Sequence, residues 1–399
     1  MLKKGIFIGI IVSVLGVFCG AGLFFIFRPT VTKQKITSTE QKIIKNNRVD
    51  SSSEKDIKKQ QEEIFSVFNE PQVVKEAVYP KMTADGSELS ENILPVGAIV
   101  NVKSIDGNSE QVEIISDPAK GFIDKKILEP RQKHVAAREA KRQPNLTVND
   151  VQKKLDDEIA AFLANKGGDV SVFIETVDKS FSYNYNGDKI NRTASSIKLP
   201  FISYLMTLAD QGKIDLETEL TFLEHNRMDG TGIIQFEPAG KSYTLEQLAE
   251  LTIRYSDNVA YVMLLNHLGE SNFIQFLSEL DSNSPNNRVF STPQILTKAM
   301  AYVHKKSESQ PETKMRLLYD WLQQSIFDDG VAIGLPGVDV SHKTGWMPKY
   351  MVSNDIALVH DKERPYYITI MTNGYDDTYS EQAISDLSQI LDTQLLQLK

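Results

Sequence analysis

The interpretation of this sequence begins at one short segment, Thr193-Ala194-Ser195-Ser196-Ile197-Lys198-Leu199-Pro200. The apolar residues that follow predict a helix over 199–211, and positions three apart lie on one face of a helix. Ser195 and Lys198 should therefore face the same side. Burial lowers the pKa of a lysine, so a buried Lys198 can accept the proton of the Ser195 hydroxyl. A serine at a helix start also has unpaired backbone N–H groups beside it, which can bind a developing oxyanion.

The Ser195–Lys198 motif is informative only together with two further motifs, because serine and lysine occur three apart by chance in most proteins. Ser256-Asp257-Asn258 follows a predicted amphipathic helix, and Lys343-Thr344-Gly345 precedes a predicted strand. Taken alone, the first is equally typical of the N-cap of the next helix, and the second of a loop. Asp257 is expected to have a structural role.

The order and separation of the three motifs resemble those of active-site serine β-lactamases and penicillin-binding proteins, which carry Ser-x-x-Lys, Ser-Asp-Asn and Lys-Thr-Gly. The surrounding residues resemble class A β-lactamases at Gly230-Thr231-Gly232-Ile233-Ile234, at 245–251 and at Asn354-Asp355-Ile356-Ala357. The resemblance runs from about residue 151 to the C-terminus. It implies the α/β (α+β) sandwich of the β-lactamase/transpeptidase fold, in which both ends of the domain contribute strands to one sheet.

The resemblance implies a role for each residue of the first two motifs. Ser195 would attack the acyl carbon, and Lys198 would assist its deprotonation. Ser256 would pass a proton to the leaving group, and Asn258 would orient Lys198 and a substrate amide.

The third motif would bind the substrate. Lys343 and Thr344, followed by Gly345, would hold a substrate carboxylate through charge-assisted hydrogen bonds. The backbone N–H groups of Ser195 and Trp346 would form the oxyanion hole. Trp346 departs from the family pattern, since a smaller residue is usual there, and its bulk should narrow the cleft. No metal and no cofactor are expected.

A missing residue determines which activity we expect. Class A β-lactamases need a glutamate, on a loop between the second and third motifs, to activate the water that releases the acyl group. Here residues 281–290 contain no glutamate, and a helix is predicted to start soon afterwards, at Pro293. Asp281 is the only carboxylate in this stretch, and we expect it at the surface, at a helix end. Loss of a general base should slow release of the acyl group by about a hundredfold to ten-thousandfold.

These observations favour a serine acyl-transfer enzyme of the penicillin-binding type, acting on cell-wall peptide or ester and poor at β-lactam turnover. A β-lactam would be a covalent ligand. Two alternatives remain: a non-catalytic receptor or scaffold that binds wall fragments, and an unusual class A-like β-lactamase. The sequence does not indicate a protein partner. The net charge of −9 argues against a nucleic-acid partner, which would require clustered lysine and arginine.

The start of the chain predicts a membrane anchor. Lys3 and Lys4 precede an uncharged, mostly apolar stretch at 5–27, and its roughly 23 residues can cross about 30 Å of hydrocarbon. It is longer than the apolar core of a signal peptide and lacks a small-residue cleavage site. We interpret residues 1–28 as an uncleaved transmembrane signal anchor, with the remainder outside the cytoplasm at the cell membrane. Cys19, the only cysteine, lies in this stretch; a lipoprotein acceptor is the less favoured alternative, because bulky Phe18 precedes it.

The remaining chain divides into four parts by composition. Residues 29–70 are polar and read as a spacer. Short alternating segments with tight turns predict a small β domain at 71–130, whose last strands resemble those of bacterial SH3 domains. Residues 131–147 are interpreted as a connector with a helical start, and 148–399 as the serine hydrolase domain. Within it we expect a helix at 148–165, a hairpin of 169–175 with 180–186, a helical middle, strands at 354–360 and 366–372, and a final helix.

Overall fold

The structure is a computed structural model that describes residues 70–90, 94, 96–104, 109–115, 120–310, 312–327, 330–376 and 378–399. The predicted anchor at 5–27, and all of the predicted spacer except Glu70, lie outside the described residues. Within the described ranges, no helix is both long and apolar enough to cross a membrane.

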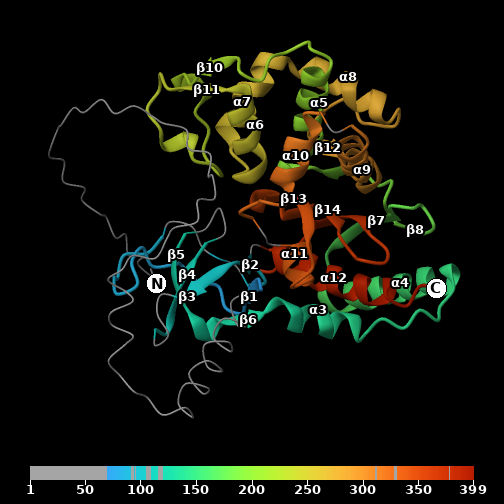
Figure 1. Cartoon of the computed structure of the whole chain (residues 1–399). Helices are drawn as coiled ribbons and strands as arrows, with labels where there is room; N and C mark the ends of the chain where they lie inside the picture. The colour runs from blue at the N-terminus through green and yellow to red at the C-terminus, as the bar shows by residue number, and fades with distance from the viewer. Residues whose placement is uncertain are drawn as a thin grey trace, which may run out of the picture. The chain divides into compact units, whose positions relative to one another are not determined.

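A five-stranded antiparallel sheet forms the centre of the larger domain (Figure 1). Its strands follow the order β13-β14-β15-β7-β8, so strands from the end of the chain pair with the hairpin from the start of the domain. The bounds are β7 (Asp169–Thr176), β8 (Ser182–Tyr185), β13 (Val340–Met347), β14 (Val352–Val359) and β15 (Tyr366–Asn373). Every residue of β14 is buried, because helices cover both faces of the sheet. The predicted hairpin and the two predicted late strands are therefore present.

Helices α4 (Val148–Lys166) and α12 (Ser380–Leu395) pack together on one face, while α9 (Pro293–Ser309) lies against β7, β14 and β15 on the other (Figure 1). The amphipathic pattern of α4 explains its place: Val151, Leu155 and Ile159 recur at helical spacing and are fully buried. Its N-terminus is fixed by a capping box between Thr147 and Asp150.

The helical middle of the domain surrounds α5 (Lys198–Asp210). Residues 198–206 of α5 are all buried, so this helix forms the centre of a second apolar core. Around it lie α6 (Leu245–Arg254), α7 (Asn258–Leu268), α8 (Glu270–Leu280) and α10 (Met315–Leu322). This part of the domain also has two short strand pairs: β9 (Asn191–Arg192) pairs with β12 (Phe290–Ser291), and β10 (Glu219–Thr221) pairs with β11 (Ser242–Thr244). A short helix, α11 (Val331–Gly334), leads into β13.

The segment before this domain contains two three-stranded antiparallel sheets, ordered β2-β1-β6 and β3-β4-β5. Its strands are β1 (Gln72–Val74), β2 (Ile99–Val100), β3 (Val102–Ser104), β4 (Gln111–Ile114), β5 (Gly121–Asp124) and β6 (Leu128–Pro130). Val74, Val100, Val112, Ile114 and Ile123 share a small apolar core. Apart from the 3-10 turn η1 (Lys125–Ile127), the regular structure described in this segment is thus β-strand.

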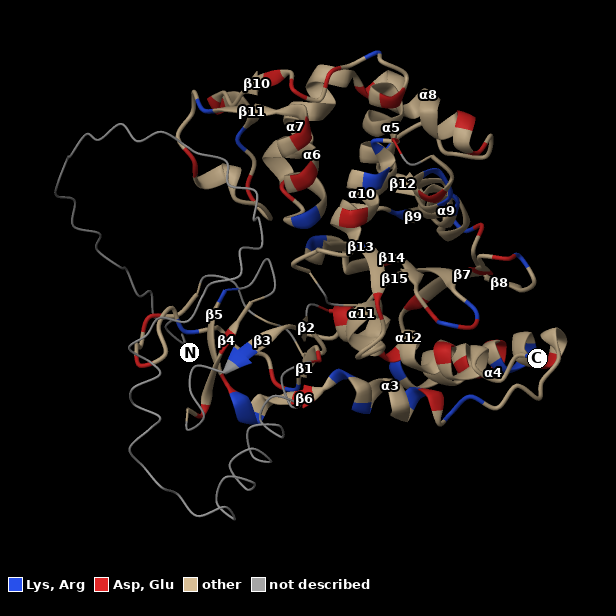
Figure 2. Ribbon diagram, viewed as in Figure 1, with Lys and Arg blue, Asp and Glu red and all other residues tan. Residues whose placement is uncertain are grey.

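Helix α3 (Arg131–Glu139) forms the helical start expected for the segment 131–147, and it also makes ion pairs with the larger domain. Arg138 donates two hydrogen bonds to the Asp392 carboxylate, at 2.8 and 2.7 Å, and one to Asp361 at 2.6 Å. Burial raises the pKa of Asp361, but the hydrogen bonds from Arg138 and Arg142 outweigh this and leave the pKa lowered. Figure 2 shows the basic residues of α3 beside the acidic residues of the larger domain. Buried ion pairs therefore join α3 to the domain that carries α12.

The motif Lys343-Thr344-Gly345 precedes the strand predicted at 354–360, as expected, but it lies in a strand that was not predicted rather than in a loop. The structure places the motif inside β13, where Lys343 pairs with Ile356 and Gly345 with Asn354 of β14. Because β13 is an edge of the sheet, one side of this strand can face the helical part of the domain.

Candidate active site

Ser195 lies in a 3-10 turn, η2 (Ala194–Ile197), that continues directly into α5. Ala194 has a φ of 47°, a left-handed conformation that non-glycine residues rarely adopt outside strained functional sites. The neighbouring Ser196 is fully buried, and its hydroxyl donates to the Thr193 carbonyl at 2.5 Å. Ser195 instead lines a cavity. The two serines are thus in different environments, and Ser195 is the one that a ligand can reach.

Ser256 lies between the two lysines of the motifs. Lys198 donates from Nζ to the Ser256 carbonyl at 2.6 Å, to Ser256 Oγ at 3.2 Å and to Asn258 Oδ1 at 2.7 Å. Lys343 donates to the same Ser256 Oγ at 3.1 Å. Ser256, like Ala194, has a φ of 47°. The structure therefore gathers residues of all three motifs around one hydroxyl.

The electrostatics of this cluster make the Lys198 ammonium easier to deprotonate. Burial lowers the pKa of Lys198 well below its ordinary value of 10.5, and the nearby charge of Lys343 lowers it further, while Asp257 opposes both. A neutral amine can accept a proton, which a charged ammonium cannot do.

Asp257 has the structural role that the sequence analysis expected. One carboxylate oxygen accepts hydrogen bonds from the backbone N–H groups of Ile233 and Ile234, at 2.7 and 2.9 Å, and the other caps α7 through Ala260. Gly232, with a φ of 108°, lies so close that a Cβ there would be 2.3 Å from the Asp257 Cγ. These contacts explain why glycine is required in the segment 230–234.

Gly345 brings β13 against the nucleophile turn. A Cβ at this position would lie 2.5 Å from the backbone nitrogen of Ser196 and 3.0 Å from that of Ser195. From the next strand, the Asn354 side-chain amide donates to the carbonyls of Arg192 and Thr193, both at 2.9 Å. Sequence reasoning found Asn354 only as part of a resembling segment and missed its task of fixing the backbone before Ser195.

The cavity at this site has a volume of about 540 Å³. Four predicted site residues line it together with Trp346; the complete lining is Ser195, Gly230, Thr231, Ser256, Asn258, Phe327, Thr344, Trp346, Met347, Pro348 and Glu381. Trp346 is 44% exposed, so its ring forms part of the wall without closing the cavity. Lys198 and Lys343 are buried beside it through their bonds to Ser256. Glu381 and Phe327 are lining residues for which the sequence gave no signal.

The loop that lacks the glutamate is short in the structure as well. It runs from the end of α8 at Leu280 to β12, and α9 begins at Pro293. Asp281 is not the surface residue that was expected: it is 7% exposed and forms an ion pair with Lys298. Burial raises the pKa of Asp281, but the bonds from Lys298 and the Asn283 backbone outweigh this and leave it lowered. The Asp281 carboxylate therefore stabilises the loop and does not line the cavity.

A buried pair supports β13 next to Lys343. His342 Nδ1 lies 3.1 Å from Asp355 Oδ2, and the same oxygen accepts a hydrogen bond from the Val331 backbone at 2.9 Å. Both side chains are almost fully buried. The pair therefore ties α11 and β14 to the strand that carries the third motif.

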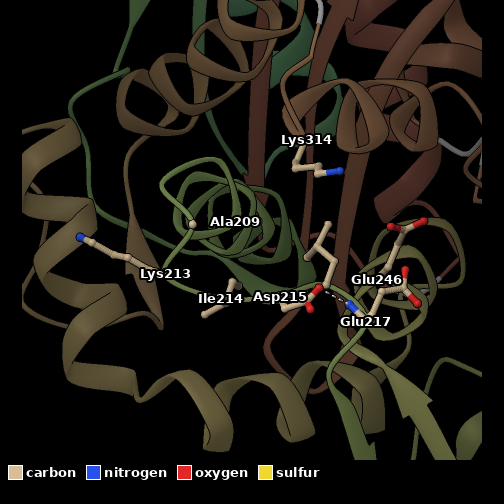
Figure 3. A pocket seen from close by; sticks show the side chains of 9 residues that line it. Ala209, Lys213, Ile214, Asp215, Glu217, Glu246 and Lys314 are labelled. Carbon is tan, nitrogen blue, oxygen red and sulfur yellow. Dashed lines mark hydrogen bonds between the residues drawn. The ribbon is translucent and has the colours of Figure 1, made fainter.

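A second hollow, of about 460 Å³, lies at the end of α5 and contains none of the motif residues. Asp215, Glu217 and Glu246 contribute carboxylates and Lys314 an amine, while Lys213 points away from Glu217 and Glu246 (Figure 3). Across the part of the chain that the structure describes, no group of three or more histidine, cysteine, aspartate or glutamate side chains is arranged to hold a metal ion.

Comparisons with known proteins agree with this geometry. The β-lactamase enzyme family matches residues 154–395. The chain is 29% identical over 169 residues to β-lactamase 3 of Bacillus cereus, covering 37% of this chain and 53% of that protein. It is 23% identical over 278 residues to a β-lactamase of Bacillus licheniformis, covering 64% of this chain and 86% of the relative. Among solved structures, PBP-A has a TM-score of 0.56 at 21% identity, covering 62% of this chain and 96% of PBP-A.

The chain therefore belongs to the β-lactamase enzyme family. It is a serine hydrolase of that family, and its larger domain has the mixed α/β fold seen in the structural relatives.

Proposed function

We propose that this protein is a membrane-anchored, extracytoplasmic serine acyl-transfer enzyme of the penicillin-binding type, which acts on cell-wall peptide or ester and turns β-lactams over poorly. The proposal rests on one observation: the site has the groups for acylation but lacks the base for release of the acyl group. The groups needed to form an acyl-enzyme surround Ser256, whereas the loop that would supply the base for its hydrolysis is short and lacks a glutamate.

Acylation begins at Ser195. Its Oγ attacks the acyl carbon as its proton passes to the neutral amine of Lys198, and the negative charge develops on the acyl oxygen. The backbone N–H groups of Ser195 and Trp346 bind that oxygen, since β13 lies against the nucleophile turn at Gly345.

The leaving group departs with a proton from Ser256. The Ser256 hydroxyl accepts hydrogen bonds from both Lys198 and Lys343, so a proton can pass through it from Lys198 to the leaving nitrogen or oxygen. The bond between the acyl carbon and the leaving atom then breaks, and the acyl group remains as an ester on Ser195. Lys343 and Thr344 hold the substrate carboxylate during this step.

Release of the acyl group distinguishes the two kinds of substrate. Asp281 is bound to Lys298 and does not line the cavity, so no carboxylate of the loop is available to activate water. A bulky β-lactam adduct would also block the approach of a small nucleophile, whereas a linear acyl chain leaves room for water or an amine. A solved structure of the PBP-A L158E mutant is described as an acyl-enzyme complex with penicillin G, and this relative supports covalent capture of a β-lactam here.

The placement outside the membrane rests on the apolar stretch at 5–27. The all-β segment before α3, whose end resembles bacterial SH3 domains, supports a role at the cell wall. This segment has a small apolar core of its own, which supports its reading as a separate module.

The test compares two linear donors with a penicillin. A peptide ending in D-alanyl-D-alanine and its D-lactate ester are incubated with the full chain, and product release is followed beside the hydrolysis of penicillin G. We expect repeated turnover of a linear donor and a single, slowly released equivalent of penicillin, with Ser195→Ala inactive towards all three. Faster steady-state hydrolysis of penicillin than of either donor would establish a β-lactamase instead. Absence of any reaction with all three would favour a binding protein.

A further inference from the structure

Three residues before Ser195, an arginine lies close to two aromatic rings. The Arg192 guanidinium lies 4.9 Å from the centre of the Phe290 ring and 4.0 Å from that of Tyr350. Lys349 Nζ lies 5.6 Å from the same tyrosine ring. We call Arg192, Phe290, Lys349 and Tyr350 the arginine platform. Phe290 is 36% and Tyr350 41% exposed, so large aromatic surface here faces solvent.

The platform is built by the backbone around the site. Arg192 on β9 pairs directly with Phe290 on β12, and Tyr350 ends the turn η5 (Pro348–Tyr350) that follows β13. Asn354 fixes the Arg192 carbonyl with the same side-chain amide that fixes Thr193. The Arg192 backbone is therefore fixed, and contact of its guanidinium with two rings limits the motion of the side chain, which reduces the entropy lost on binding.

The cations of the platform have unused hydrogen-bonding capacity. Among the described residues, none accepts a hydrogen bond or forms an ion pair with the Arg192 guanidinium or with Lys349 Nζ. Contact with a ring face leaves the N–H groups in the plane of a guanidinium able to donate hydrogen bonds. Arg192 and Lys349 both lie near the Tyr350 ring, and two cations without an anionic partner among the described residues favour an anionic ligand.

The position of the platform identifies the part of the substrate that would reach it. Arg192 precedes Ser195 by three residues, so their Cα atoms are within about 10 Å of each other. β13 runs from Lys343, past Trp346, to Met347 and then Tyr350. An extended substrate with its terminal carboxylate at Lys343 and its acyl carbon beside Trp346 would continue on the acyl side towards the platform.

We propose that Arg192, which lies over the rings of Phe290 and Tyr350, is a specificity residue that binds a carboxylate on the acyl side of the substrate. This inference rests on the proposed function, because it assigns a second anchoring point to the same linear donor. A planar guanidinium can donate two parallel hydrogen bonds to a carboxylate, and Lys349 adds positive charge. The substrate class is thus a linear acyl donor with a carboxylate on each side of the scissile bond.

The test uses two thioester donors that differ only in the cap of the acyl chain, glutaryl with a carboxylate or glutaramide with a neutral amide. The wild type should acylate with the glutaryl donor about tenfold more efficiently, in kcat/KM, than with the glutaramide donor. Arg192→Gln should lower kcat/KM for the glutaryl donor alone, and Arg192→Lys should have an intermediate effect because it keeps the charge without the fork. Lys213→Ala removes an equal charge at the remote hollow of Figure 3 and should leave the preference unchanged. An equal fall for both donors in Arg192→Gln, or a preserved preference, would overturn the assignment.

A binding measurement separates this inference from the proposed function. Calorimetry with the Ser195→Ala protein uses unreactive amide analogues with the same two caps and a third analogue with a phosphonate cap. Tighter binding of the carboxylate cap, lost in Ser195→Ala/Arg192→Gln, supports the platform even if thioesters fail to acylate Ser195. Equal binding of the carboxylate and amide caps, or tighter binding of the phosphonate, refutes the carboxylate assignment.

Discussion

Substitution of Gly345 by alanine should separate the folding of the domain from the chemistry of Ser195. The new Cβ would lie 2.5 Å from the Ser196 nitrogen, whereas ordinary contacts begin at 3.4 Å, so the atoms must move apart by about 0.9 Å. Backbone atoms surround this position, and no flexible side chain can yield. Overpacking of this kind costs about 1–3 kcal/mol of stability. A misplacement of about 1 Å at a catalytic geometry lowers the rate on the order of a hundredfold.

Stopped-flow acylation by a fluorescent penicillin, with circular dichroism to confirm folding, measures both effects. We expect a folded Gly345→Ala protein whose acylation rate is about a hundredfold below that of the wild type. Gly212→Ala is the control variant, because no atom lies within 4 Å of its added Cβ; its φ of 65°, which Gly345 does not share, adds backbone strain there without a clash. An acylation rate of Gly345→Ala within threefold of the wild type would refute the argument that close contact between β13 and the nucleophile turn positions the reacting groups.

Four other changes test different parts of the account. Ser195→Ala should abolish labelling by acylating probes, whereas Ser196→Ala should retain labelling with about 1 kcal/mol less stability, as peptide mass spectrometry and thermal melts will show. Because the pKa of Lys198 is lowered, the acylation rate should rise with pH as its ammonium deprotonates and level off well below pH 10.5; a rate that still rises at pH 10.5 would contradict this. Arg138→Ala leaves two buried carboxylates without their main partner and should cost about 3–5 kcal/mol, or roughly 6–20 °C in melting temperature; a shift of under 2 °C would mean that α3 is only a tether. Asp281→Asn should lower the melting temperature without changing the lifetime of a penicillin adduct, and a longer lifetime would identify it as a base.

The sequence predicted the parts of the fold that depend on periodicity and on motifs. The hairpin of β7 and β8, the late strands and most helices of the domain were found, because alternating and helical apolar patterns report directly on burial. Helix α10 was missed, and so was strand β13, which contains Lys343-Thr344-Gly345; the motif was placed only before the following strand. In a sequence, a lysine buried in an edge strand cannot be distinguished from a lysine in a loop, because its buried partner, the Ser256 hydroxyl, is not recognisable there.

The site shows a similar division between what local sequence reveals and what it does not. Spacing alone singled out Ser195 over Ser196, and the structure agrees in giving only Ser195 a place in the cavity. Contacts between residues far apart in the chain left no local signal. The burial of Asp281 beside Lys298, the bond from Asn354 to Arg192 and the docking of α3 all depend on tertiary packing.

The role of Lys198 as a base could be inferred from the sequence, but the lowering of its pKa could not. Its spacing from Ser195 suggested a base, yet a depressed pKa requires burial and a neighbouring cation, and Lys343 is 145 positions further along the sequence. The fold supplies both conditions, because β13 carries Lys343 to the same hydroxyl that binds Lys198.

The central claim is that this protein acylates efficiently at Ser195 but releases a β-lactam slowly, and timed intact-mass spectrometry tests it most directly. The full chain is mixed with a small excess of penicillin G, quenched at intervals and weighed. The account predicts rapid conversion to a single adduct, absent in Ser195→Ala, that persists after the free penicillin is removed. Rapid loss of the adduct with consumption of many equivalents of penicillin would contradict the claim.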